Sequence, residues 1–274
     1  MRIKQAVLLC GGKGTRLKPI TNTTPKPMVN IHGKPFLYYL LKQLSKKNIS
    51  EFVLLTGYLG EQIHDYFKSG KKYGWKIKYS KGPSFWNTGK RILEAKKLFQ
   101  NNFMLLYSDN YLNFNIDILI NYHFQNNKNI TLQLVKKKQG NISLDSKKQI
   151  QYYDSFRKKE NLDYVEIGYM LVRKKNLLKD FNNLSSDSDF NFSSVLKKYS
   201  IKKKLGNVLS DNIYYSISDI KRLKLTKNFL NKKKILLIDR DGIINEKASK
   251  ARYIEKWKEF KFIDKNIKAL KILS

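Results

Sequence analysis

The sequence is poor in cysteine, histidine and acidic residues. It has one cysteine, three histidines, and 22 Asp and Glu against 55 Lys and Arg in 274 residues. The single Cys10 excludes an internal disulfide and a zinc site built from several cysteines. No apolar run approaches the roughly 20 residues that a membrane-spanning helix needs, and the five apolar residues 6–10 are too few for the core of a signal peptide. We therefore expect a soluble, cytoplasmic protein that does not bind membranes.

The residues that are present favour a folded chain with an unusually basic surface. An apolar fraction of 41% supports a sizeable core, enough for one large α/β domain or a medium domain with an addition. The net charge of +33 has two interpretations, a lysine-rich surface or attraction to polyanions such as nucleotides or nucleic acid. Because the lysines are scattered and no nucleic-acid-binding signature accompanies them, we favour the first and expect no specific nucleic-acid partner.

The hydrophobic pattern predicts an α/β fold over residues 1–230. Expected strands alternate with expected helices in the first half, the strands at 3–9, 52–55, 75–79 and 103–107 and the helices at 35–46, 61–67 and from 88. This alternation is typical of a doubly wound, mostly parallel sheet. Further strands indicate an extension that makes the sheet mixed; they are expected at 130–135, 149–153, 164–172 and 213–217, with helices at 177–181, 195–199 and 220–230. Ligands of such sheets bind beyond the carboxyl ends of the strands.

The segment Leu8–Pro35, LLCGGKGTRLKPITNTTPKPMVNIHGKP, carries the strongest functional signal. An apolar strand runs directly into a Gly-rich, cationic loop. Glycines allow backbone N–H groups to approach oxyanions, and basic side chains neutralise the negative charge. The segment therefore predicts a binding site for a polyphosphate.

From Gly11 to Pro35 this segment fits GGxGTRLxPxTxxxPKPMxxxxGKP, which resembles the signature of the sugar-1-phosphate nucleotidyltransferases. The resemblance implies a Rossmann-like nucleotidyltransferase fold, NTP and sugar 1-phosphate substrates, and Mg²⁺ as cofactor. It assigns catalysis to Arg16 and Lys26, which would contact the triphosphate and stabilise charge at the α-phosphorus. Phosphoryl-type transfer needs such positioning and charge neutralisation more than covalent catalysis. The nucleotide would be held by Leu9, Cys10, Gly11, Gly12, Lys13, Gly14 and Thr15.

The same resemblance extends to two later sites. Asp109, at the end of the strand 103–107, would hold Mg²⁺ against the phosphates. Asn87 and Thr88 would contact the nucleotide and Gly89 the sugar, although Asn87 stands where the family usually has glycine. Gly82 stands where relatives often place a base-reading Gln, which leaves the base open.

Sugar and second-metal positions are less well matched. Glu166 and Gly168 resemble the segment that contacts the sugar hydroxyls, and a carboxylate there could accept two hydrogen bonds. The alternative is a strand-edge Glu paired with a lysine. Ser216 stands where the family commonly has the second Asp ligand of Mg²⁺, and a hydroxyl is a poor ligand for this cation.

A second segment begins near residue 231. Residues 235–246, ILLIDRDGIINE, resemble the first motif of haloacid-dehalogenase-type phosphatases, which implies a nucleophile at Asp239 and an acid and base at Asp241. Only about 40 residues follow the boundary, too few for an independent α/β domain, so we interpret 231–274 as an incomplete, short α/β fragment. The sugar-bisphosphate branch of these phosphatases includes heptose enzymes, which favours a heptose 1-phosphate substrate and, more weakly, GTP.

The sequence therefore predicts a nucleotidyltransferase that makes an NDP-sugar for surface polysaccharide or glycan synthesis. Three alternatives remain: another hexose-1-phosphate nucleotidyltransferase, a non-catalytic nucleotide-sugar-binding regulator, and a polyanion-binding protein. A homo-oligomer is also left open.

Overall fold

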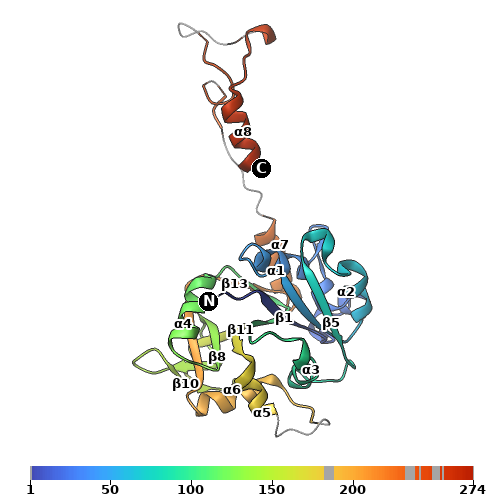
Figure 1. The fold of residues 1–274 in the computed structure, drawn as a ribbon, viewed down its shortest axis with the longest axis vertical. Coiled ribbons are helices and arrows are strands. Elements are labelled where there is room, and N and C mark those ends of the chain that lie inside the picture. Colours follow the sequence, from blue (N-terminus) through green and yellow to red (C-terminus); the bar gives the residue numbers. More distant parts are fainter. Residues whose placement is uncertain are drawn as a thin grey trace. The chain divides into compact units, whose positions relative to one another are not determined.

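The computed structural model describes residues 2–181, 188–231, 238–240, 242–248, 254 and 256–273. The chain forms two compact units, Met1–Asn231 and Lys232–Ser274 (Figure 1). No helix among the described residues is long and apolar enough to cross a membrane.

A block of four parallel strands forms the centre of the first unit. The strands are β1 (Gln5–Cys10), β4 (Glu51–Thr56), β5 (Lys76–Lys81) and β6 (Asn102–Tyr107), in the order β6-β1-β4-β5. All six residues of β1 are buried. Their side chains alternate between two hydrophobic clusters, with Leu8 in one and Val7 in the other. Both faces of the sheet are therefore covered, which explains the continuous apolar run in the sequence.

Helices cover each face of this sheet (Figure 1). The cluster that contains Leu8 takes in apolar residues of α1 (Phe36–Ser45), α2 (Gly60–Phe67), α4 (Ile116–Gln125) and α7 (Ile220–Leu230). The cluster that contains Val7 takes in α3 (Thr88–Glu94), α5 (Lys174–Phe181) and α6 (Phe192–Ile201). This is the doubly wound arrangement predicted from the sequence.

The later strands extend the same sheet, which has nine strands in the described chain. The long strand β11 (Tyr164–Arg173) pairs antiparallel with β6 and with β8 (Ile130–Lys136), and β12 (Leu205–Ser210) pairs parallel with β8. Two short strands complete the edge, β9 (Ile142–Leu144) and β10 (Ile150–Tyr153). The predicted fold class, a doubly wound, mixed α/β sheet with a parallel centre, is confirmed.

Among the elements that sequence reasoning missed are α4, β7 (Asn110–Leu112), β9 and β12. Helix α4 begins at Asn115, whose side chain accepts hydrogen bonds from the N–H groups of Asp117 (2.9 Å) and Ile118 (3.3 Å). The missed strands are short or contain glycine, and so lack a clear alternation. Strand β7 pairs with β13 (Tyr214–Ser216), which brings the chain after β6 against the start of α7.

The second unit contains a helix, α8 (Asp264–Leu273), and an isolated bridge between Asn245 and Phe262. Trp257 stacks on Phe260 with ring centroids 5.1 Å apart. The strand expected at 235–238 lies mostly outside the described residues, as does Asp241. Asp239 is described and exposed.

The hydroxyl of Tyr169 on β11 connects β7 to α1, and its contribution to stability can be tested. This buried hydroxyl donates to Gln43 Oε1 of α1 (3.1 Å) and accepts from the N–H of Leu112 on β7 (3.3 Å). We expect Tyr169→Phe to lower the free energy of unfolding by about 1–3 kcal/mol, because it leaves buried polar groups without a partner.

The matched control is Tyr164→Phe on the same strand. Tyr164 is half-buried and its hydroxyl bonds to no described residue, so a change within about 0.5 kcal/mol is expected. Urea titration followed by circular dichroism measures both. Equal losses in the two variants would contradict the role given to the Tyr169 hydroxyl.

Candidate active site

A cavity of about 480 Å³ lies beyond the carboxyl ends of β1 and β6. Its wall includes these residues expected from the sequence: Leu9, Cys10, Gly11, Gly12, Gly14, Thr15, Arg16, Lys26, Asn87, Thr88 and Asp109. Lys13 and Gly89 are not among its lining residues. Segments separated by up to a hundred residues thus meet in one place, as the positions of the strand ends predicted.

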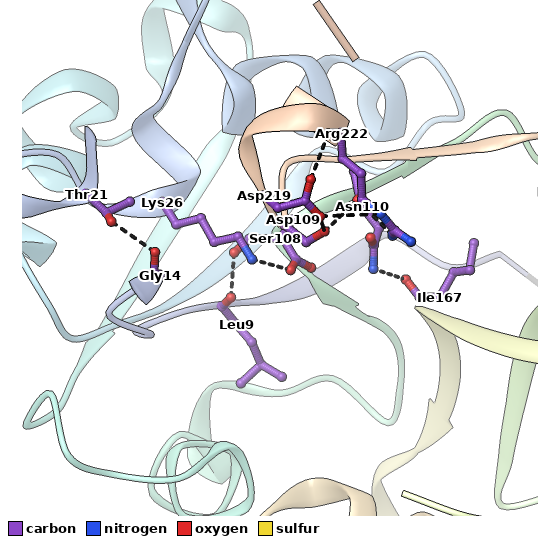
Figure 2. A network of polar contacts seen from close by, with 12 residues as sticks. Leu9, Gly14, Thr21, Lys26, Ser108, Asp109, Asn110, Ile167, Asp219 and Arg222 are labelled. Atoms are coloured by element: carbon purple, nitrogen blue, oxygen red, sulfur yellow. Dashed lines mark hydrogen bonds and ion pairs between the residues drawn. The ribbon is translucent and has the colours of Figure 1, made fainter. Parts of the chain in front are cut away.

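The Gly-rich loop reaches this cavity through a tight turn at Gly14. Gly14 has a φ of 63°, which favours glycine, and a Cβ at this position would lie 3.0 Å from Cβ of Lys26. The Thr21 hydroxyl donates to the Gly14 carbonyl (2.9 Å) and fixes the turn (Figure 2). Arg16 and Lys26 follow within two short 3₁₀ helices, Thr15–Leu17 and Lys26–Met28.

An ion pair joins the loop to the end of β6. Lys26 Nζ lies 2.5 Å from Asp109 Oδ2, and the two side chains are only 15% and 24% exposed. Asp109 is held in turn by the Ile217 N–H, which donates to its carbonyl (2.9 Å), while the preceding Ser108 donates its hydroxyl to Leu9 O (2.6 Å) (Figure 2). A cation from the loop and a carboxylate from the end of the sheet therefore meet in the cavity wall.

A second cavity of about 240 Å³ adjoins the first and shares Arg16, Tyr107, Asp109 and Ser218 with it. Glu166 lines this smaller cavity, and its Oε2 accepts a hydrogen bond from the Gly168 N–H (2.9 Å). Burial raises the pKa of Glu166 to about 8, although the Gly168 N–H and Arg157 act in the opposite direction. The carboxyl group is therefore mostly protonated at neutral pH.

The alternative given for Glu166, an ion pair with a lysine, is not seen among the described residues. Gly168 has a conformational role, because its φ is 75° and a Cβ there would lie 2.3 Å from the Tyr107 ring. The glycine thus brings the Glu166 segment close to the end of β6.

The structure places Ser216, the position expected to bind a second metal ion, outside the walls of both cavities. Ser216 is 3% exposed; its Oγ lies 3.1 Å from Ser218 Oγ and accepts from Arg222 Nη1 (3.3 Å). It lines neither of the two cavities, whereas Ser218, which sequence reasoning missed, lines both. The Asp219 carboxylate lines the smaller cavity and accepts from the Arg222 N–H (2.9 Å) (Figure 2).

The carboxylates that line the cavities determine how a metal ion could be bound. Within the described parts of the chain, no three His, Cys, Asp or Glu side chains gather into a metal-binding group. Mg²⁺ is often bound by one or two carboxylates together with substrate phosphates and water. Asp109 fits this mode, with Asp219 as the neighbouring carboxylate, because it lies where the two cavities meet.

The start of α3 is held by a loop that precedes α6. Asp189 accepts from the Asn87 N–H (2.8 Å) and from Asn87 Nδ2 (2.9 Å), and the Thr88 hydroxyl accepts from the Phe192 N–H (2.8 Å). Gly89 donates its N–H to Phe190 O (2.8 Å), and a Cβ at Gly89 would lie 2.2 Å from the Phe190 ring. The structure therefore gives Gly89 a packing role instead of a place in the cavity wall.

Besides Ser218, sequence reasoning missed other lining residues, among them Trp86, Arg91 and Asn191. The Trp86 ring fills the space beside Gly82, where an added Cβ would lie 2.4 Å from it. Arg91 follows Thr88 in a predicted helix, but nothing in its local pattern distinguishes it from a surface arginine. Asn191 comes from the loop that holds α3 and has no local signal.

Comparison with known proteins agrees with this geometry. A family model described as nucleotidyl transferase matches residues 5–152. The chain is 37% identical over 140 residues to the probable glucose-1-phosphate cytidylyltransferase of Bacillus subtilis, covering 43% of this chain and 55% of that protein. It is 32% identical over 218 residues to the D-glycero-alpha-D-manno-heptose 1-phosphate guanylyltransferase of Campylobacter jejuni, covering 78% of this chain and 94% of that protein. The match thus spans about half the length of the first relative and nearly all of the second.

Solved structures share the fold. A putative glucose-1-phosphate thymidylyltransferase from Bacillus anthracis aligns with a TM-score of 0.74 at 16% identity, covering 86% of this chain and 98% of that one. HddC from Yersinia pseudotuberculosis aligns with a TM-score of 0.69 at 20% identity, covering 84% and 100%. With the family model matched from β1 to β10 and one relative matched over nearly its whole length, the chain belongs to the nucleotidyl transferase family.

Proposed function

We propose that this chain is a sugar-1-phosphate nucleotidyltransferase, which converts an NTP and a sugar 1-phosphate into an NDP-sugar and pyrophosphate. The observation that carries the proposal is the half-buried pair of Lys26 and Asp109, which joins a cationic Gly-rich loop to the end of a central strand. The names of the matched relatives in Bacillus subtilis and Campylobacter jejuni, both sugar-1-phosphate nucleotidyltransferases, support it.

In this reaction a phosphate oxygen of the sugar 1-phosphate attacks the α-phosphorus of the NTP. The new P–O bond forms as the bond to the bridging oxygen breaks, and the electron pair leaves with pyrophosphate. Arg16 and Lys26 would neutralise the charge on the phosphoryl oxygens, Arg16 as a fixed fork and Lys26 as a mobile point charge. Lys26 would exchange Asp109 for phosphate oxygens as the nucleotide binds.

Mg²⁺ would be held by Asp109 together with phosphate oxygens and water, and when bound it neutralises the charge of the triphosphate. The sugar would occupy the smaller cavity beside Glu166. The protonated carboxyl group can both donate to and accept from sugar hydroxyls without adding negative charge near the phosphates.

For the substrate we propose a heptose 1-phosphate, with GTP as the donor nucleotide. The Campylobacter jejuni relative, named for this sugar and this base, matches 78% of the chain. The resemblance of residues 235–246 to a phosphatase motif supports the same sugar chemistry, and we propose that 1–230 form the transferase domain while 231–274 form a phosphatase-like segment. A hexose 1-phosphate is the alternative substrate.

Variants of the charged residues test the reaction class. We expect Arg16→Ala and Asp109→Ala each to reduce pyrophosphate release by about a hundredfold or more, because Arg16 would neutralise charge in the transition state directly and Asp109 would hold the Mg²⁺ that does so. The exposed residues Arg2 and Asp65 provide controls of the same type, and Arg2→Ala and Asp65→Ala should retain full turnover. Full activity of Arg16→Ala or Asp109→Ala would exclude the assignment.

A matrix of four NTPs against several sugar 1-phosphates, read by pyrophosphate release, tests the substrate. We expect the highest kcat/KM for GTP with a heptose 1-phosphate, because the relative named for this pair is matched over 94% of its length. Preference for a hexose 1-phosphate would change the proposed sugar substrate but not the proposed reaction. No pyrophosphate from any pair would favour the regulator that binds nucleotide-sugars without catalysis.

The raised pKa of Glu166 predicts a pH dependence of sugar binding. As the pH passes through about 8, the carboxyl group ionises, and its charge then repels the sugar phosphate. We expect the KM for sugar 1-phosphate to rise between pH 7 and pH 9 in the wild type and to stay flat in Glu166→Gln, which mimics the neutral acid. A tenfold higher KM of Glu166→Gln at pH 7 would show instead that an ionised carboxylate binds the sugar.

A further inference from the structure

Arg91 is a buried cation in the wall of the larger cavity. It lies on α3 and is only 4% exposed. Its guanidinium donates from Nη1 to Thr56 O (2.8 Å), and from Nη2 to Pro83 O (2.6 Å) and Gly11 O (3.3 Å). One side chain thus binds carbonyl groups of three separate segments.

These three segments follow neighbouring strands of the parallel block. Gly11 comes directly after β1, Thr56 is the last residue of β4, and Pro83 comes two residues after β5. Two backbone hydrogen bonds also join them, from Tyr58 N to Gly11 O (3.2 Å) and from Gly82 N to Thr56 O (3.1 Å). Arg91 adds a rigid, planar fork that connects all three ends at once.

Two neighbouring glycines leave the space that the Arg91 guanidinium occupies. A Cβ at Gly11 would lie 2.3 Å from the Arg91 guanidinium carbon, and a Cβ at Gly57 would lie 2.6 Å from Nη2. Neither glycine has a positive φ, so the close approach of Arg91 explains these glycines better than backbone conformation does. The path of the Gly-rich loop and the position of the guanidinium are therefore coupled.

The charge of Arg91 is balanced by carbonyl dipoles. Among the described residues, no carboxylate lies within ion-pair distance of its guanidinium. Burial lowers the pKa of Arg91, with the charge of Asp189 acting in the opposite direction, but an arginine remains protonated in proteins. Burying this charge is costly, and an apolar side chain could fill the same space at a lower cost, so packing alone does not explain an arginine here.

We propose that Arg91 is a positioning residue that fixes the nucleotide side of the cavity by binding the ends of β1, β4 and β5 together. The inference rests on the proposed function, because it assigns the larger cavity to the NTP. With Gly11 held in place, the loop is set before the nucleotide arrives, and less free energy is lost in ordering it. Arg91 does not line the smaller cavity, so its effect is confined to the nucleotide.

The test compares Arg91→Ala and Arg91→Lys with Arg173→Ala. Arg173 is a half-buried arginine at the end of β11 that donates to His123 O (3.2 Å) and lines neither cavity, so it controls for a general loss of stability. Dissociation constants for GTP, ATP, CTP and UTP with Mg²⁺ are measured by tryptophan fluorescence below the melting temperature of each variant. The KM for sugar 1-phosphate is measured at saturating NTP.

We expect both Arg91 variants to bind nucleotide ~10- to 100-fold more weakly, with the KM for sugar 1-phosphate changed by less than about twofold. A lysine retains the charge but reaches one carbonyl in place of three, so Arg91→Lys should not restore affinity, whereas added guanidinium ion should partly restore it in Arg91→Ala. Wild-type affinity in Arg91→Lys would overturn the inference in favour of charge alone. Wild-type affinity in Arg91→Ala would overturn it altogether.

Hydrogen exchange in the absence of any substrate separates this inference from the proposed function. Amides of residues 8–17 should exchange faster in Arg91→Ala than in the wild type or in Arg173→Ala. Unchanged exchange overturns the positioning role. If the wild type binds no NTP and releases no pyrophosphate, the proposed function fails, and the exchange result alone then decides whether Arg91 holds the loop.

Discussion

The position of β1 at the centre of the sheet is the constraint on which the site depends. Its backbone pairs with β4 on one side and β6 on the other, and its six residues are buried on both faces. A strand held in this way cannot shift in register without exposing apolar side chains, so the point at which it ends is fixed. The Gly-rich loop begins at this point, and the end of β6, with Asp109, is fixed by the same pairing.

The site also depends on how the positive charges that line the two cavities are compensated. The chain is strongly basic, but several cations that line the cavities have partners that compensate their charge. Lys26 is paired with Asp109, Arg222 with Asp219, and Arg91 with carbonyl groups. Arg16 and Arg157 have no ion pair among the described residues. Among the cations that line the cavities, Arg16 thus leaves positive charge where the two cavities adjoin and Arg157 in the wall of the smaller one, which suits a place where phosphate groups of two substrates meet.

Much of this architecture could be predicted from the sequence, because its signals are local. The run from Val7 to Leu9 indicates a buried strand, and the glycines and basic residues that follow indicate a phosphate-binding loop. Asp109 could be identified because it follows a clear strand and because the resemblance to the family places a metal-binding aspartate there. The predicted sheet then placed these two features at the same edge.

The residues that were missed reach the cavity through tertiary contacts. Arg91 meets Gly11 across 80 positions of sequence, and Asn191 arrives on a loop that is ordered against α3 by Asp189. No periodicity distinguishes such residues, since their roles depend on what packs against them. Ser216 shows the converse: a position chosen from the resemblance to the family motif has its hydroxyl beside Ser218 and Arg222, and Ser218 lies in the cavity wall.

The residues that border both cavities are placed where the proposed transfer reaction would occur. Arg16, Tyr107, Asp109 and Ser218 border both, so a nucleotide in the larger cavity and a sugar phosphate in the smaller one would have their reacting phosphates at the junction that these residues line. An in-line exchange requires the attacking oxygen and the leaving group on opposite sides of the α-phosphorus, and two adjoining cavities provide that separation. Arg91 and Glu166 then lie on opposite sides of the reacting groups. Because each borders only one cavity, a change at Arg91 or at Glu166 would alter the affinity for one substrate without altering the residues that border both cavities.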